Sequence, residues 1–210
     1  MRRTKTEAEK TRQDLMRSAW HIFSQKGYVE TRLSDIAKEA GVTRGAIYWH
    51  FGNKENLLIS LFKDRADSYF TIISGILASD SSPLEKIKAI LVNIIRKMET
   101  DDQIKAEEIL MLRRADDQGR FRQIHDYIKQ RTEKHFELLF RIIVEGQERG
   151  EIRKGVDPQH IVSLLFVFIG GFAKLEMRRH APPFEVPDSA ELVDLFLMGI
   201  RAEESKLNGS

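Results

Sequence analysis

Residues 41–51, which read Gly-Val-Thr-Arg-Gly-Ala-Ile-Tyr-Trp-His-Phe, combine hydrogen-bond donors and apolar side chains at helical spacing. The guanidinium of Arg44 can donate to O6 and N7 of a guanine together, which is the commonest specific contact between a side chain and a base. Ile47 and Phe51 are four residues apart and are the better candidates for the core. The stretch therefore predicts a short helix with an apolar side and a side that contacts a polyanion.

Three further residues of this stretch bear on that contact. Tyr48 and His50 have side chains that donate to phosphate oxygens, although the alternative is that one of the two packs inward. Gly45 lowers helix stability, so its presence indicates a steric demand. That demand comes either from a base or from a neighbouring helix, and the sequence leaves both alternatives open.

The elements that position these residues are two short helices joined at Gly41. The run over residues 33–40 is amphipathic, and Thr43 is the expected N-cap of the helix that follows. This layout is that of a helix-turn-helix, whose second helix lies in the major groove of DNA. Small residues at the start of the second helix allow its backbone to approach the duplex closely.

Charge is distributed unevenly along the 210 residues. Residues 1–54 contain 11 Lys and Arg against 6 Asp and Glu, a net charge of +5, whereas the whole chain has +2 and the remainder therefore −3. A basic first quarter on an acidic body indicates that the N-terminal part contacts a polyanion. The chain has no cysteine, which excludes disulfides and thiolate metal sites and is compatible with a reducing, cytoplasmic location.

Periodicity and helix-capping residues predict an all-α protein of about nine helices, since no segment alternates as a strand does. The expected helices span residues 6–26, 33–40, 43–50, 54–79, 83–100, 102–115, 120–149, 157–180 and 188–204. Thr6 with Glu9 is the expected capping box of the first helix. Residues 1–54 are expected to form a three-helix domain and residues 55–210 a larger helical domain, with the long fourth helix shared between them.

The expected helix over residues 157–180 is apolar on two faces. One face consists of Ile161, Leu164, Leu165, Phe168, Phe172 and Leu175, and the opposite one of Phe166, Gly170 and Ala173. A helix that is apolar on both sides has to be buried on both sides. Either it is a core helix, or one side meets another subunit together with Leu192 and Phe196 of the last helix. The longest apolar run, residues 161–172, is too short to span a bilayer.

Residues 5–62 resemble the TetR/AcrR family of bacterial transcriptional repressors, and the opening segment is similar to the AcrR-like branch that controls multidrug efflux pumps. The resemblance rests on Ile36-Ala37, on residues 40–45, on residues 47–51, and on Lys54 and Leu57. It implies a homodimer that binds a palindromic DNA operator. It also implies release by a small-molecule effector in the larger domain, which serves ligand binding and dimerisation, with no part played by a membrane.

Carried over by position, the resemblance implies specific contacts with DNA. Arg44 and Gly45 face bases, and Trp49 either lies at the edge of the groove or supports the fold. The implied phosphate contacts are Thr43, Tyr48, His50 and Lys54.

One position departs from the family pattern. Arg32 stands at the N-cap of the expected second helix, where the family usually has Ser or Thr, and a guanidinium accepts no hydrogen bond. Either Thr31 or Ser34 caps the helix instead, or Arg32 adds a phosphate contact at a cost of about 1 kcal/mol.

Polar side chains interrupt the apolar faces of the larger domain and are candidates for a ligand pocket. They are Arg65 and Tyr69 on the fourth helix and His125, Thr132 and His135 on the helix over residues 120–149, with Phe168 and Phe172 as aromatic lining. Such a lining predicts an apolar or aromatic ligand with few polar groups. The alternative is structural, in which each buried polar group has a partner within the protein.

The sequence has no Gly-rich phosphate loop, no nucleophile elbow and no spacing suited to a metal. We therefore expect a ligand-responsive transcriptional repressor that has no catalytic residue and needs no cofactor or metal. Two alternatives remain. One is an activator or ligand-independent DNA-binding regulator, and the other is a helical small-molecule-binding protein or enzyme with an incidental helix-turn-helix.

Overall fold

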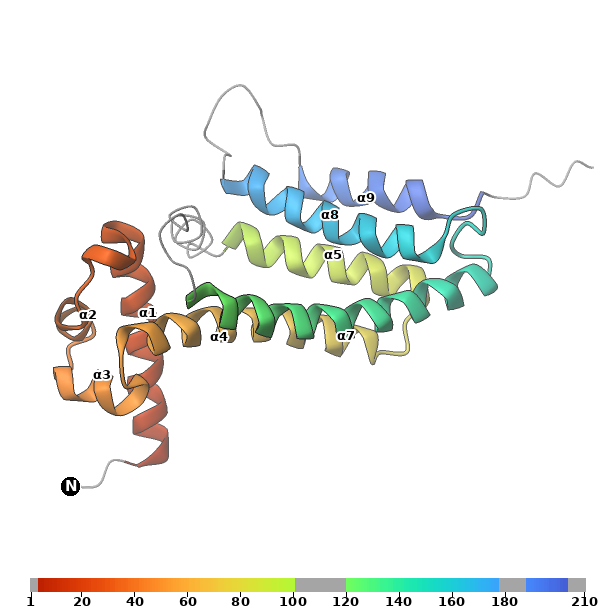
Figure 1. Ribbon diagram of the computed structural model, residues 1–210. Helices are drawn as coiled ribbons and strands as arrows, with labels where there is room; N and C mark the ends of the chain where they lie inside the picture. The colour runs from red at the N-terminus through yellow and green to blue at the C-terminus, as the bar shows by residue number, and fades with distance from the viewer. Residues whose placement is uncertain (1–3, 101–119, 178–187, 204–210) are drawn as a thin grey trace, which may run out of the picture. The chain divides into compact units, whose positions relative to one another are not determined.

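The computed structural model describes residues 4–100, 120–177 and 188–203, and its regular elements are all α-helices (Figure 1). They are α1 (Lys5–Glu30), α2 (Leu33–Glu39), α3 (Arg44–Phe51), α4 (Lys54–Leu77), α5 (Pro83–Thr100), α7 (Arg120–Glu148), α8 (Pro158–Met177) and α9 (Ser189–Ile200). The all-α fold is confirmed, and these bounds lie within a few residues of those expected. The helix expected over residues 102–115 lies outside the described residues.

Local capping explains most helix starts. The side chains of Asn53, Ser82 and Asp188 accept amide hydrogen bonds at the starts of α4, α5 and α9. The first helix differs from expectation, because Thr4 and Glu7 form its capping box rather than Thr6 and Glu9. Both pairs have the required spacing, so the sequence alone could not decide between them.

The described residues divide into two compact units, each with its own apolar core. The first comprises residues 4–67 and 120–129, and the second comprises residues 68–100, 130–177 and 188–203. Helices α4 and α7 therefore contribute residues to both units. The predicted boundary after residue 54 falls at the start of α4.

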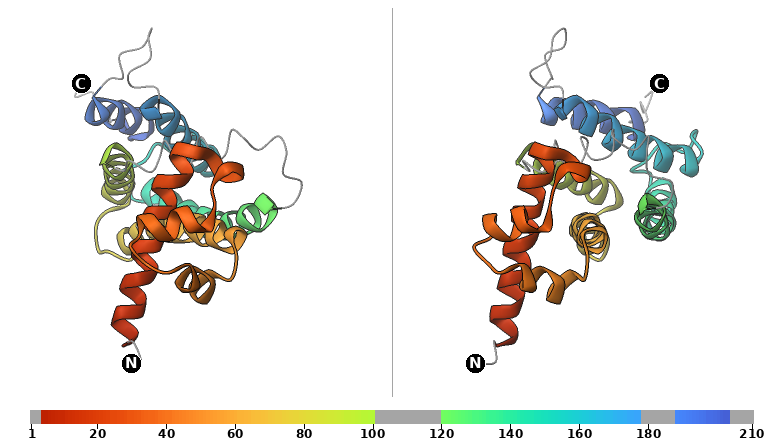
Figure 2. Two further views of the ribbon diagram at one scale, coloured as in Figure 1. Left: turned by 90° about the vertical axis from the view of Figure 1, so that its left-hand side faces the viewer. Right: turned by 60° about the vertical axis from the view of Figure 1, so that its left-hand side comes forward.

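The core of the first unit holds the helix-turn-helix. Helix α2 packs on α1 and α3 packs on α2 (Figure 2). Each helix supplies buried apolar side chains, among them Trp20 and Phe23 from α1, Ile36 from α2, Ile47 and Phe51 from α3, and Leu57, Leu61 and Phe62 from α4. The position of α3 is thus fixed by the burial of its apolar side chains.

In the second unit α5 packs against both α8 and α9 (Figure 1). Its core includes Ile87, Leu91, Ile94, Ile143, Ile161, Leu165, Phe172, Val193 and Ile200. Gly146 on α7 is required by this packing, because a Cβ there would come within 2.5 Å of Ile152 Cδ1 and 3.0 Å of Pro83 Cβ.

Helix α8 is the one described helix that is long and apolar enough to cross a membrane by length and composition, over Pro158–Leu175. This length includes polar side chains such as Gln159, His160 and Lys174 on either side of the apolar run over residues 161–172. Core helices of soluble proteins have the same length and composition.

Candidate functional site

Helix α3 presents one face to the core and one face to solvent. Ile47 and Phe51 are buried, whereas Arg44, Tyr48 and Trp49 are exposed. The Trp49 side chain is 73% exposed, which rules out the alternative that it supports the fold. A cluster of exposed aromatic side chains is typical of a contact surface.

The structure also bears on the two open questions at Gly45 and His50. A Cβ at position 45 would meet only Thr43 Oγ1, at 3.8 Å, so no neighbouring helix requires glycine there. The exposed backbone at Gly45 can therefore be approached closely by another molecule. His50 is half-buried and its ring lies edge-on to Trp49, with centroids 4.4 Å apart, so it is His50 rather than Tyr48 that lies nearer the interior.

Arg44 and Tyr48 are joined on the exposed face of α3. Arg44 Nη2 donates to the Tyr48 hydroxyl oxygen at 2.9 Å, and the guanidinium carbon lies 5.4 Å from the centre of the phenol ring. Thr43 stands at the N-cap position as expected, but its side chain makes no capping hydrogen bond. Residues 43–48 therefore present a guanidinium and two hydroxyl groups at the start of the helix.

At the start of α2, Arg32 occupies the N-cap position with its side chain exposed. Neither Thr31 nor Ser34 caps the helix. Instead Asp35 Oδ2 accepts a hydrogen bond from the Arg32 amide at 3.4 Å and another from Lys26 Nζ at 3.1 Å. The bond from Lys26, followed by that from the Arg32 backbone, holds the pKa of Asp35 below its ordinary value.

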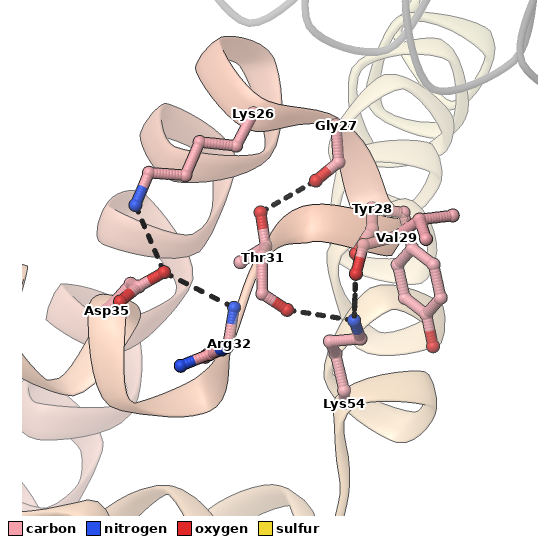
Figure 3. Close-up of polar contacts among 8 residues, drawn as sticks. All are labelled: Lys26, Gly27, Tyr28, Val29, Thr31, Arg32, Asp35 and Lys54. Carbon is pink, nitrogen blue, oxygen red and sulfur yellow. Dashed lines mark hydrogen bonds and ion pairs between the residues drawn. The ribbon is translucent and has the colours of Figure 1, made fainter.

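Lys54 has an arrangement that the sequence did not predict (Figure 3). Its ammonium donates to the carbonyl oxygens of Tyr28 at 2.8 Å, Val29 at 3.2 Å and Thr31 at 2.8 Å. An ammonium has three donors. All three face protein carbonyls, whereas the sequence predicted a contact with phosphate. The partners lie more than 20 residues earlier in the chain, so no local pattern signals them.

The predicted ligand residues fall into both units. Arg65 packs in the first core, with its guanidinium carbon 6.0 Å from the centre of the Trp20 ring. His125 also belongs to the first unit and is exposed, with Nδ1 3.6 Å from Asp126 Oδ1. The other five, Tyr69, Thr132, His135, Phe168 and Phe172, belong to the second unit.

His135 is the buried polar residue of that second group. It is buried, its ring stacks on Phe70 with centroids 4.8 Å apart, and Nε2 lies 3.0 Å from Ser74 Oγ. Nδ1 lies 2.9 Å from the Arg131 carbonyl oxygen, so a neutral ring carries its proton on Nδ1 and accepts from the Ser74 hydroxyl. Sequence reasoning missed Phe70 and Ser74, although they lie four residues apart on one face of α4.

Helices α8 and α9 carry an exposed apolar stripe that the sequence only partly located. It consists of Leu164, Val167, Gly171 and Leu175 on α8 with Leu195 and Met198 on α9. Of the predicted dimer residues, Gly170 is exposed, while Ala173 and Leu192 are half-buried. Phe166 stacks on Phe136 and Phe196 is buried against Phe168, so both aromatic rings are used within the chain.

Within the described residues, no group of three or more His, Asp or Glu side chains is arranged to hold a metal. The fold and the site together define a helix-turn-helix DNA-binding protein with a second, larger helical unit.

Comparison with known proteins identifies the family. The profile described as bacterial regulatory proteins, tetR family, matches residues 15–61, and the profile described as YsiA-like protein, C-terminal region, matches residues 62–172. The chain belongs to the TetR family, as the resemblance implied, and is a transcriptional repressor rather than an enzyme. It is 27% identical over 173 residues to the transcriptional repressor BepR of Brucella suis, covering 82% of this chain and 83% of BepR.

Two solved structures show the same fold. NalD, the secondary repressor of the MexAB-OprM multidrug efflux pump in Pseudomonas aeruginosa, superposes with a TM-score of 0.71 at 24% identity, covering 94% of this chain and all of NalD. FadR from Bacillus subtilis, in complex with stearoyl-CoA, superposes with a TM-score of 0.68 at 24% identity, covering 90% of this chain and 99% of FadR.

Proposed function

We propose that this protein is a cytoplasmic homodimeric repressor that binds a two-fold symmetric operator and leaves it when a small apolar molecule binds. The observation that carries the proposal is the exposed face of α3, where Arg44, Gly45 and Tyr48 project from a helix anchored by Ile47 and Phe51. Arg44 reads a base, the backbone at Gly45 approaches the groove, and the Tyr48 hydroxyl and Thr43 contact phosphates. Trp49 lies at the edge of the groove.

The apolar stripe supports a dimer. Val167, Leu195 and Met198 are each more than 60% exposed, and two copies of the chain would remove such side chains from water at about 25 cal/mol per Å². Gly171 lies within the stripe, and a Cβ there would meet nothing within 4 Å, so its surface is open to a second helix. A two-fold axis through this face gives the operator its symmetry.

The effector is proposed to be apolar or aromatic and to bind in the second unit among Tyr69, Thr132, His135, Phe168 and Phe172. The buried polar group among them is His135, which pairs with Ser74 and stacks on the Phe70 ring. The likeness to NalD supports control of a multidrug efflux pump. Arg65 and His125 belong to the first unit and are therefore not included among these five residues. Their predicted contact with the effector stays a prediction.

A second candidate effector is a fatty acyl-CoA thioester. The YsiA-like profile covers more than half of the chain, residues 62–172, and the FadR structure of similar fold holds stearoyl-CoA. With this effector the protein would still be a repressor that binds an operator, and only the effector and the regulated genes would differ.

The mechanism follows from the spacing of two recognition helices. A dimer competent for DNA holds its two α3 helices about 34–36 Å apart, one turn of the duplex. An effector that prefers a different spacing shifts the population away from that state, by no more than its difference in affinity for the two states. A displacement of α3 by a few ångströms then removes the contacts of one half-site.

The test begins with duplexes selected by the purified protein from a random pool. We expect a palindromic site whose affinity falls steeply with salt, because each neutralised phosphate contributes about −0.9 to the log–log slope. A reporter driven by that site should be silent with the protein and active without it. Activity that requires the protein would instead identify an activator. Stearoyl-CoA and 1-naphthol, with free coenzyme A as the control, distinguish the two effector classes.

A further inference from the structure

The end of α1 leaves backbone carbonyls that the helix itself cannot use. Gly27 has φ of 74°, which breaks α1, and the chain leaves the helix at Thr31, where φ is −76° and ψ is 129°. The last carbonyls of a helix have no amide partner within it. Here the Thr31 hydroxyl donates to the Gly27 carbonyl oxygen at 2.6 Å, and Lys54 donates to those of Tyr28 and Val29.

The electrostatics favour this use of Lys54. It is the first residue of α4, where the positive pole of its own helix repels an ammonium, while the C-terminal end of α1 carries partial negative charge. The ammonium also lies 4.4 Å from the centre of the Tyr28 ring. To reach a phosphate it would have to give up charged hydrogen bonds that are already made.

The third bond of Lys54 bears on the DNA-binding surface. The peptide group between Thr31 and Arg32 is held at both ends, because its carbonyl accepts from Lys54 Nζ at 2.8 Å and its N–H donates to Asp35 Oδ2 at 3.4 Å (Figure 3). A peptide group is planar, so contacts at its two ends fix its orientation. The exposed side chain of Arg32 extends from the Cα atom that follows this peptide, so the orientation of the peptide sets the direction in which the side chain leaves the backbone.

We propose that Lys54 is a positioning residue for DNA binding, which acts by clasping the Thr31–Arg32 peptide and thereby orients Arg32 toward a phosphate. Lys54 makes no phosphate contact of its own. The inference rests on the proposed operator binding and goes beyond it, because it assigns the phosphate contact to Arg32 and the support to Lys54.

Substitutions at position 54 separate a clasp from a phosphate contact. Lys54→Arg keeps the positive charge, but a planar guanidinium cannot direct three donors at these three carbonyls. We expect Lys54→Arg and Lys54→Met to weaken binding to the selected duplex alike, by about tenfold to a hundredfold. Lys38→Met, which removes a charge from an exposed position on α2, is the control for charge alone. Wild-type affinity for Lys54→Arg would contradict the positioning role of Lys54, while the proposal that the protein binds an operator would still stand.

The double variant tests whether Lys54 acts through Arg32. If it does, adding Lys54→Met to Arg32→Ala causes little further loss, and the salt slope stays that of Arg32→Ala alone. Two independent phosphate contacts would instead give losses that multiply and a slope that is flatter by a further 0.9 or so per subunit.

Thr31→Val keeps the proposal testable should the Lys54 variants fold poorly. It removes the hydrogen bond from the Thr31 hydroxyl to the Gly27 carbonyl oxygen without changing charge or volume greatly. If the Thr31–Arg32 peptide positions Arg32, loosening Thr31 should weaken operator binding. If Lys54 instead contacts a phosphate directly, Thr31→Val should leave operator affinity unchanged. Thermal melting of each variant shows that the protein measured is folded. Unchanged affinity for a folded Thr31→Val protein, together with multiplying losses in the double variant, would contradict the positioning role.

Discussion

At the level of single residues, Arg44 is the side chain best placed to read a base. It lies in the first turn of α3, exposed, and its guanidinium is held against Tyr48. We expect Arg44→Ala to lose about 1–3 kcal/mol of discrimination at one base pair of each half-site, because a bidentate pair with guanine is lost. The measurement is the affinity for the selected duplex compared with duplexes changed at each position.

Arg32→Ala is the matched comparison for Arg44→Ala. It should weaken selected and random duplexes by a similar factor, since a phosphate contact carries no base information. If Arg44→Ala lowered the affinity for both kinds of duplex equally, Arg44 would be a phosphate contact and base reading would belong to another residue.

Asp35 gives a prediction that depends on pH. Its pKa is lowered in the folded protein, so the carboxylate contributes stability that is present above the unfolded pKa and is lost as the pH falls through the folded pKa. Asp35→Asn should therefore melt at a lower temperature than the wild type at neutral pH. The difference should shrink as the pH falls below the ordinary value of 3.8 and through the lowered pKa of the folded protein, where the wild-type side chain also becomes neutral. A difference that is the same at both pH values would mean that the charge plays no part.

At the level of elements, the apolar stripe on α8 and α9 should decide the association of two chains. Val167→Glu places a charge in the middle of the stripe on each copy, and burying an unpaired charge is costly. We expect the dimer to dissociate at least about a hundredfold more readily, as measured by sedimentation. Gln159→Glu adds the same charge to an exposed position of α8 outside the stripe and should leave the dimer intact.

The helices could be predicted from sequence because their ends depend on local groups. Asn53 and Asp188 cap their helices within a few residues, so a pattern along the chain suffices. The face of α8 that meets its own core could not be predicted. Both faces are apolar, and only tertiary packing puts Phe166 against Phe136 and leaves Val167 outside.

The contact residues of α3 were predictable for the same reason, since Arg44 and Tyr48 stand one turn apart, as do the buried Ile47 and Phe51. Lys54 was not, because its partners are set by the approach of α1 to the start of α4. A lysine near a helix N-terminus in a basic domain fits a phosphate contact equally well by pattern alone.

At the level of the whole molecule, effector and operator have to act on each other reciprocally. If stearoyl-CoA or 1-naphthol lowers operator affinity by some factor, the operator has to lower the affinity for that compound by the same factor. Calorimetric titration of the protein with and without the selected duplex measures both. A compound that releases DNA without this reciprocal loss would not act by binding the protein, and an action on the DNA itself would have to be tested.

The two tryptophans of the chain have a practical consequence. Both belong to the first unit: Trp20 is 4% exposed and packs edge-on against Phe62, while Trp49 is 73% exposed on α3. Indole emission from this protein therefore comes from the DNA-binding unit alone, with a shielded component and a solvated one. A collisional quencher such as iodide should dim Trp49 and spare Trp20. Operator DNA should protect the solvated component, so the unmodified protein carries its own optical signal for occupancy of the recognition helix.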